Sequence, residues 1–163
     1  MLDTFAHKGK RKQLVDVLAK KGITNKQVLK AIGVIPRHLF MDSGFVDHAY
    51  IDKAFPIGAE QTISQPFTVA KQTELLNLEK GAKILEIGTG SGFQTAVLIE
   101  MGMQVFSIER QNELFKKAKL FLPKLGYRAK KLIFGDGYKG FKDEAPFDGI
   151  VVTAGAPFVP KPL

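Results

Sequence analysis

The sequence predicts an α/β protein built on a Rossmann-like, doubly wound and mostly parallel sheet. Three observations predict this class. Short apolar runs alternate with stretches of helical periodicity from residue 83 onward. A glycine-rich turn follows the first of these runs directly, and acidic residues stand at the ends of the next two. A length of 163 residues suits one domain, so we expect a single domain over 1–163, with an N-terminal subregion over 1–80 and the sheet over 81–163.

Helices and loops are predicted for the N-terminal subregion. Leu14, Val17 and Leu18 recur at helical spacing, and Thr24-Asn25-Lys26-Gln27 has the form of a capping box that opens a second helix. Pro66 is suited to the first position of a third helix. The predicted elements are helices over 9–20, 24–33 and 66–78, the second ended by Gly33, with a loop-rich segment over 34–63 that shows no sustained period.

Strands and helices alternate in the second half, as expected of right-handed βαβ units around a parallel sheet. Pro123 and Gly126 are predicted to stop the last helix. The predicted elements are strands over 83–88, 104–109, 131–135 and 148–153, with helices over 92–101 and 111–122. An N-terminal helical region followed by a four-stranded sheet is the expected organisation.

The glycine-rich turn Gly88-Thr89-Gly90-Ser91-Gly92 is typical of a strand that passes into a helix beneath a nucleotide-like cofactor. Glycines allow a tight turn and a close approach of the backbone to a ligand. A dinucleotide fingerprint requires a glycine at the position of Phe93, whereas here the third glycine is Gly92. Glu86 before the turn completes the pattern E-x-G-x-G-x-G. A structural turn without a ligand is the alternative.

Acidic residues end the next two strands. Glu109 lies about 20 residues after Gly88, where a carboxylate can accept both hydroxyls of a ribose. Asp136, between two glycines, can accept from an exocyclic amine such as that of adenine. The alternatives are a surface ion pair of Glu109 with Arg110 or a lysine, and an ordinary Asp-Gly turn at Asp136 and Gly137.

Two hydroxyl side chains, Thr62 and Ser64, come just before the helix that Pro66 opens. Free N–H groups at a helix N-terminus can bind a carboxylate. Capping of this helix by Ser64 or Gln65 is the competing interpretation, and from the residues alone it is favoured. Ser64 lacks the G-x-S-x-G context of a hydrolase nucleophile.

Composition limits the class of partner. The net charge of +8 permits nucleic-acid binding, but basic and aromatic residues are not interleaved, so we expect a solvated basic surface. His7, His38 and His48 show no metal-ligand spacing, so we predict no metal site.

The sequence also bears on localisation. No apolar run is long enough to span a membrane, and no signal peptide is recognisable. The absence of cysteine is compatible with a reducing cytoplasm, where we expect the protein to lie, and we also expect it to be a monomer.

Eight segments together resemble one family, the S-adenosylmethionine-dependent protein-L-isoaspartate O-methyltransferases. The Thr62 to Pro66 segment is specific to that family, whereas many methyltransferases share the glycine turn and the strand-end acids. The resemblance covers nearly the whole chain and rests on Pro36-Arg37-His38-Leu39-Phe40, Ala49-Tyr50, Pro56-Ile57-Gly58, Gln61-Thr62-Ile63-Ser64-Gln65-Pro66, Leu85-Glu86-Ile87-Gly88-Thr89-Gly90-Ser91-Gly92, Ser107-Ile108-Glu109-Arg110, Gly135-Asp136-Gly137 and Ala145-Pro146-Phe147-Asp148.

The resemblance implies methyl transfer to the α-carboxylate of L-isoaspartyl residues in damaged proteins and peptides, with S-adenosylhomocysteine as the other product. It implies that Ser64 is the active-site residue, with Thr62 beside it. It also implies that the glycine turn cradles the amino-acid part of the cofactor, that Glu109 binds ribose and that Asp136 and Gly137 face adenine. The expected cofactor-binding residues are Glu86, Gly88, Thr89, Gly90, Ser91, Gly92, Glu109, Arg110, Asp136 and Gly137.

One departure from the family pattern concerns the C-terminus. Only four core strands are readable, where the family fold continues with further strands, so we expect this chain to be a fragment that lacks them. Two other functions stay open. The first is a methyltransferase acting on RNA or a small molecule, and the second is a cofactor-binding module that has lost its activity through the truncation. Against an amino-methylating RNA enzyme, the fourth strand is followed by Thr153-Ala154-Gly155-Ala156-Pro157 and not by an Asn/Asp-Pro-Pro-Tyr motif.

Overall fold

A parallel four-stranded sheet forms the centre of the protein in a computed structural model that describes residues 2–155, 160, 161 and 163. Its strands are β3 (Lys83–Ile87), β4 (Gln104–Glu109), β5 (Lys131–Phe134) and β6 (Gly149–Val152), in the order β5-β4-β3-β6. The chain adds β4 and β5 on one side of β3 and then returns to place β6 on the other side. This reversal confirms the doubly wound sheet and puts its topological switch point between β3 and β6.

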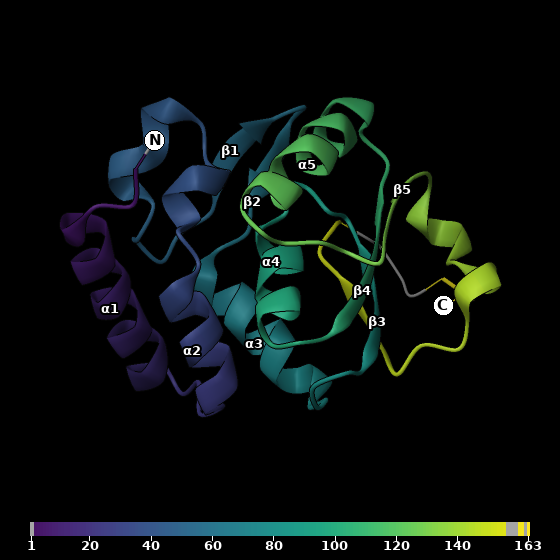
Figure 1. Cartoon of the computed structure of the whole chain (residues 1–163), viewed down its shortest axis with the longest axis horizontal. Coiled ribbons are helices and arrows are strands. Elements are labelled where there is room, and N and C mark those ends of the chain that lie inside the picture. Colours follow the sequence, from purple (N-terminus) through teal and green to yellow (C-terminus); the bar gives the residue numbers. More distant parts are fainter. Residues whose placement is uncertain (1, 156–159, 162) are drawn as a thin grey trace.

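Helices cover one face of the sheet in two layers (Figure 1). The inner layer is α3 (Pro66–Leu76), α4 (Phe93–Glu100) and α5 (Asn112–Lys124), which pack on β6, β4 and β5 respectively. The outer layer is α1 (Phe5–Lys20) and α2 (Lys26–Val34), which contact each other and α3. Ile84, Val105 and Val151 point from the strands into this core. Among the described residues, no helix is long and apolar enough to cross a bilayer.

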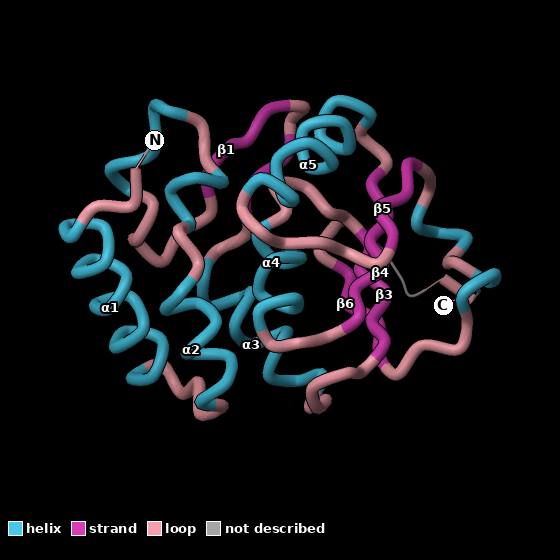
Figure 2. The backbone as a smooth tube through the Cα atoms, viewed as in Figure 1, coloured by secondary structure: helices cyan, strands magenta, loops and turns pink. Residues whose placement is uncertain are grey.

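The opposite face of the sheet is covered by the connection between β5 and β6. Leu85, Phe106 and Ile108 form a second, smaller core there, against Phe141 and Phe147 of that connection. Figure 2 shows this connection as loops with short helical turns, η3 (Gly137–Lys139) and η4 (Lys142–Glu144). Alternate residues of β3 therefore face different cores, with Ile84 and Glu86 turned toward the helices.

The predicted strands and helices of the second half are confirmed to within about two residues at their ends. One detail was wrong: Pro123 lies inside α5, which continues to Lys124. A proline removes only its own N–H donor, which in the last turn costs a single hydrogen bond. Leu125 then closes the helix by donating to the carbonyls of Phe121 and Leu122.

The N-terminal helices differ from the prediction at their ends. α1 begins at Phe5 because the Thr4 hydroxyl accepts from the His7 amide while the His7 ring accepts from the Thr4 amide, a capping box with histidine as third residue. Asn25, not Thr24, caps α2, accepting from the amides of Gln27 and Val28. Gly33 lies inside α2, which ends at Val34.

The segment predicted as loop-rich contains regular elements. Two short helical turns, η1 (Arg37–Phe40) and η2 (Ser43–His48), precede a hairpin of β1 (Phe55–Gly58) and β2 (Gln61–Ile63). Its tip, Ala59 and Glu60, takes left-handed φ angles of 49° and 56° without a glycine. The hairpin delivers residues 62–64 to the start of α3, beside the switch point of the sheet.

Candidate active site

A cavity of about 310 Å³ opens at the carboxyl ends of the strands, beside the switch point between β3 and β6. This is the position at which doubly wound sheets bind their ligands, and the volume lies within the range of small-molecule sites. Ten of the twelve site residues expected from the sequence line it: Thr62, Ser64, Gly88, Thr89, Gly90, Ser91, Glu109, Arg110, Asp136 and Gly137. The fold thus brings three strand ends and the Thr62–Ser64 segment together around one space.

The glycine turn is fixed from both neighbouring strands. The Gly88 amide donates to the Ile108 carbonyl at 2.8 Å, and the Thr153 hydroxyl donates to the Gly88 carbonyl at 2.6 Å. Gly88 has a φ of +97°, and a Cβ there would lie 3.1 Å from the Cβ of Ala154. Only a glycine at position 88 lets the backbone pass this close to the end of β6. The ends of β3 and β6 therefore form one continuous floor of the cavity.

Glu109 lies at the end of β4 and is 5% exposed. Its Oε2 accepts from the Gly90 amide at 2.7 Å and its Oε1 from the Gln111 amide at 2.8 Å. A carboxylate has about four lone-pair sites, so each oxygen keeps one for a ligand hydroxyl. The carboxylate is thereby held in a fixed orientation at the cavity wall, as recognition of a vicinal diol requires.

Asp136 and Gly137 follow β5 at the same edge. The Asp136 carboxylate accepts from the Tyr138 amide at 3.0 Å and is otherwise exposed toward the cavity mouth. A Cβ on Gly137 would lie 2.3 Å from Cγ2 of Ile87, which also lines the cavity. The glycine therefore lets the chain after β5 lie directly against the end of β3.

Glu86 and Gly92 were expected to contact a cofactor, but neither lines the cavity. Glu86 faces the helices and is fully buried, and its Oε2 accepts from the Thr95 hydroxyl at 2.5 Å. Burial raises the pKa of Glu86 to about 7. Gly92 is the N-cap of α4, in the left-handed conformation. Both residues lie behind the turn, where they support it.

Gln94 is a cavity residue that the sequence did not indicate. Its side-chain amide donates to the Thr73 hydroxyl at 2.8 Å, while its Oε1 has no hydrogen-bond partner among the described residues. It was missed because a glutamine on a helix carries no local signal of its surroundings.

Capping of α3 by Ser64 or Gln65, the interpretation favoured from the residues, is not observed. Gln65 is the N-cap residue, but no side-chain cap bond is made.

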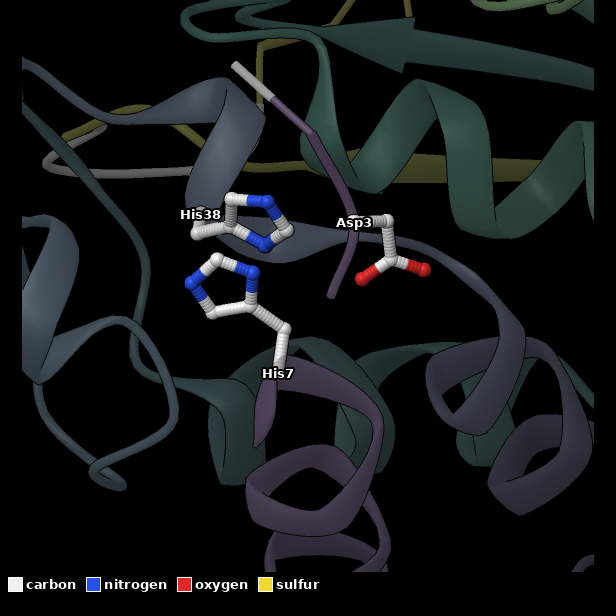
Figure 3. A group of neighbouring side chains, drawn as sticks. All are labelled: Asp3, His7 and His38. Carbon is white, nitrogen blue, oxygen red and sulfur yellow. The ribbon is translucent and has the colours of Figure 1, made fainter. Parts of the chain in front are cut away.

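Asp3, His7 and His38 gather at the start of α1 (Figure 3), and none of the three lines the cavity. Each offers a possible metal ligand, with the ligand atoms within 4.8 Å of one another. However, the two imidazoles stack with centroids 3.8 Å apart and planes 22° from parallel, so their in-plane lone pairs do not converge on one point. The Asp3 carboxylate is also engaged by both terminal nitrogens of Arg11. This arrangement docks the N-terminus and is poorly suited to a cation.

Comparison with known proteins agrees with this geometry. A solved protein-L-isoaspartate O-methyltransferase superposes with a TM-score of 0.84 at 33% identity, over 93% of this chain and 50% of that chain. A Plasmodium falciparum structure, described as a putative enzyme of the same name in complex with S-adenosyl-L-homocysteine, gives a TM-score of 0.74 at 26% identity, over 93% and 76%. The fold and the site therefore define an α/β methyltransferase.

The sequence comparisons narrow the class to a family. The family model described as protein-L-isoaspartate(D-aspartate) O-methyltransferase matches residues 9–163. Curated enzymes named protein-L-isoaspartate O-methyltransferase from Christiangramia forsetii and Flavobacterium psychrophilum are each 68% identical over the whole chain, which spans 76% of their length. The chain belongs to the protein-L-isoaspartate O-methyltransferase family.

Proposed function

We propose that this protein transfers the methyl group of S-adenosylmethionine to the α-carboxylate of L-isoaspartyl residues in damaged proteins and peptides. One observation carries the proposal: Thr62 and Ser64, in the segment specific to the family, line the same cavity as the glycine turn and Glu109. A substrate carboxylate and an adenosyl cofactor can therefore meet in one space. Two relatives at 68% identity bear the name of this activity.

The cavity residues suit this cofactor. The free lone pairs of the Glu109 carboxylate match two ribose hydroxyls, and the Asp136 carboxylate can accept from an exocyclic amine. The backbone from Gly88 to Gly90 lies open to the amino-acid part of the cofactor, and Ser91 and Arg110 also line the cavity. When bound, the cofactor supplies an electrophilic methyl group on a sulfonium.

The reaction asks the protein to position groups and to exclude water. A carboxylate is already ionised near neutral pH, so no strong general base is needed. We assign the Ser64 hydroxyl a hydrogen bond to the substrate carboxylate, which fixes its direction of approach, with Thr62 beside it. Orientation of this kind can supply up to about 7–11 kcal/mol of barrier reduction.

Replacing Ser64 by alanine tests the assignment. A hydrogen bond to a charged group contributes about 1.5–3 kcal/mol, so Ser64→Ala should lower kcat/KM for an isoaspartyl peptide about 10- to 100-fold. The dissociation constant of S-adenosylhomocysteine, measured by calorimetry, should not change. Ser43→Ala, an exposed serine on η2, is the matched control. Full activity of Ser64→Ala would contradict the role, and wild-type turnover on RNA alone would contradict the function.

We further propose that the protein acts as a monomer in the cytoplasm. A chain without cysteine suits a reducing compartment. Light scattering at the concentration of the assay, with and without an isoaspartyl peptide, tests the monomer.

A further inference from the structure

α3 begins at Pro66, two residues after Ser64, and lacks a cap of its own. Pro66, the first helical residue, has no N–H, and Gln65 makes no side-chain cap bond. An uncapped helix start leaves backbone donors without partners. Ser64, whose orientation the proposed reaction depends on, is two residues from this unsupported point.

Asp52 supplies the missing cap from outside the helix. Its Oδ1 accepts from the Phe67 amide at 2.8 Å, a bond that an N-cap side chain ordinarily makes. The Gln65 side-chain amide donates to Asp52 twice, to Oδ2 and to the backbone carbonyl, each at 3.1 Å. Asp52 thus holds the residues on both sides of Pro66, and Gln65 serves as its partner instead of capping.

The Asp52 carboxylate is itself fixed. Its side chain is 8% exposed, and its Oδ2 forms an ion pair with the Lys21 ammonium at 2.6 Å. Burial alone would raise the pKa of Asp52, but hydrogen bonds from Lys21, Phe67 and Gln65 outweigh it and hold that pKa below its usual value. The group is therefore ionised at neutral pH, which suits the positive end of a helix dipole.

Arg37 anchors the chain beside Asp52. Its Nη2 donates to the Lys53 carbonyl at 3.2 Å, and its guanidinium lies 4.9 Å from the ring centroid of Phe93. Arg37 is 1% exposed, and Phe93 lines the cavity. Arg37 therefore connects the segment that contains Asp52 to Phe93 in the cavity wall.

From this geometry we infer that Asp52 is a positioning residue of the reaction, holding Ser64 in place through the start of α3. The inference rests on the proposed function. The same geometry limits which groups can bind the substrate carboxylate. Pro66 has no N–H, and the Phe67 N–H already donates to Asp52. The first two positions of α3 thus offer no donor to a substrate anion, which supports assigning that contact to the Ser64 and Thr62 hydroxyls, both of which line the cavity.

Steady-state kinetics with Asp52→Ala and Asp52→Asn test the inference. A displacement of about 1 Å at a reacting group can cost about 100-fold, so Asp52→Ala should raise KM or lower kcat for an isoaspartyl peptide about 10- to 100-fold. Asp52→Asn keeps an oxygen for the Phe67 amide but loses the Lys21 ion pair, so its effect should be smaller. The dissociation constant of S-adenosylhomocysteine should stay within about twofold, since the residues expected to contact the cofactor lie at the ends of β3, β4 and β5, and Asp52 lies in the loop before β1.

Glu74→Ala is the matched control. Glu74 Oε1 also supports a helix start from outside, accepting from the Thr24 and Asn25 amides at 2.7 and 2.8 Å ahead of α2, but Glu74 does not line the cavity. It should destabilise the fold without a selective effect on the isoaspartyl peptide. Equal kinetic effects of Asp52→Ala and Glu74→Ala, or wild-type kinetics in Asp52→Ala, would overturn the positioning role.

Amide hydrogen exchange separates this inference from the proposed function. Exchange at residues 62–67 should become faster in Asp52→Ala and stay unchanged in Glu74→Ala, with the reverse at residues 24–28. If the wild-type protein neither methylates nor binds an isoaspartyl peptide, the proposed function is wrong, and exchange alone then decides whether Asp52 holds the segment. Unchanged exchange at 62–67 in Asp52→Ala would refute the inference whatever the substrate.

Discussion

At the scale of single residues, Gly137 determines the shape of the cavity by the atom it lacks. A Cβ there would meet Cγ2 of Ile87 at 2.3 Å and Cδ1 at 3.1 Å. Gly137→Ala must therefore displace Ile87 at the end of β3, an overpacking that costs about 1–3 kcal/mol. We expect a lower melting temperature together with weaker S-adenosylhomocysteine binding in calorimetry. Gly44→Ala, where a Cβ meets nothing within 4 Å, is the control; wild-type affinity in Gly137→Ala would contradict the expectation.

Glu86 makes stability depend on pH. Burial raises its pKa to about 7, while hydrogen bonds with Ser107 and Thr95 partly oppose the shift. Because the folded protein holds this proton more tightly than the unfolded chain, the stabilisation is present below the unfolded pKa of about 4.5 and is lost as pH rises through about 7. Between pH 5 and 8, the free energy of unfolding of the wild type should fall by up to about 3 kcal/mol relative to Glu86→Gln. Urea titrations of both proteins measure this difference, and parallel pH profiles would contradict it.

At the scale of elements, the start of α2 depends on α3. Hydrogen bonds from Asn25, Lys71 and Thr24 lower the pKa of Glu74 to about 2. Glu74→Ala should lower the free energy of unfolding at pH 7 by about 1–2 kcal/mol, the usual effect of a lost helix cap. Since the folded pKa is depressed, the contribution is present above pH 4.5 and is lost as pH falls toward 2. Urea unfolding should therefore show a smaller difference between the two proteins at pH 3 than at pH 7, and an equal difference would argue against this linkage.

The strands of the sheet could be predicted because their signals are local. Lys83–Ile87 and Gln104–Glu109 are short apolar runs that a glycine or an acid ends. The hairpin of β1 and β2 could not, because Pro56 lies inside a strand, the register shifts between Pro56 and Gly58, and the tip has no glycine. Packing against the rest of the molecule stabilises it, and such packing leaves no pattern in the segment itself.

The residues of the candidate site also fall into two groups, those that the sequence could predict and those that it could not. The strand-end residues around the glycine turn could be predicted because each belongs to a short motif. Gln94 and Asp52 could not, since their partners Thr73 and Phe67 lie 21 and 15 residues away along the chain. Their importance is a property of the folded arrangement.

At the scale of the whole molecule, cofactor binding should stabilise the fold. A ligand that binds only the folded state contributes about 2.7 kcal/mol at 100 times its dissociation constant. For a chain of 163 residues, this corresponds to a rise in melting temperature of roughly 5–10 °C with S-adenosylhomocysteine. Differential scanning fluorimetry measures the rise, with adenosine and a short RNA as comparison ligands. A shift with RNA but none with S-adenosylhomocysteine would favour a nucleic-acid partner.

The hydrogen bonds that join the ends of β3 and β6 have a consequence for the order in which the cofactor cavity forms during synthesis. The Thr153 hydroxyl bonds the carbonyls of Ile87 and Gly88, 66 and 65 residues earlier in the chain. At a synthesis rate of about 5–20 residues per second, the ribosome needs roughly 3–13 s to add that stretch. Until that stretch is complete, the glycine turn has no partner on the side that β6 will occupy. β4, which is made within the stretch, can pair with β3 before β6 exists. The nascent chain therefore acquires the β6 side of the cavity only when β6 has emerged and paired with β3, long after the motif that marks the site has been made.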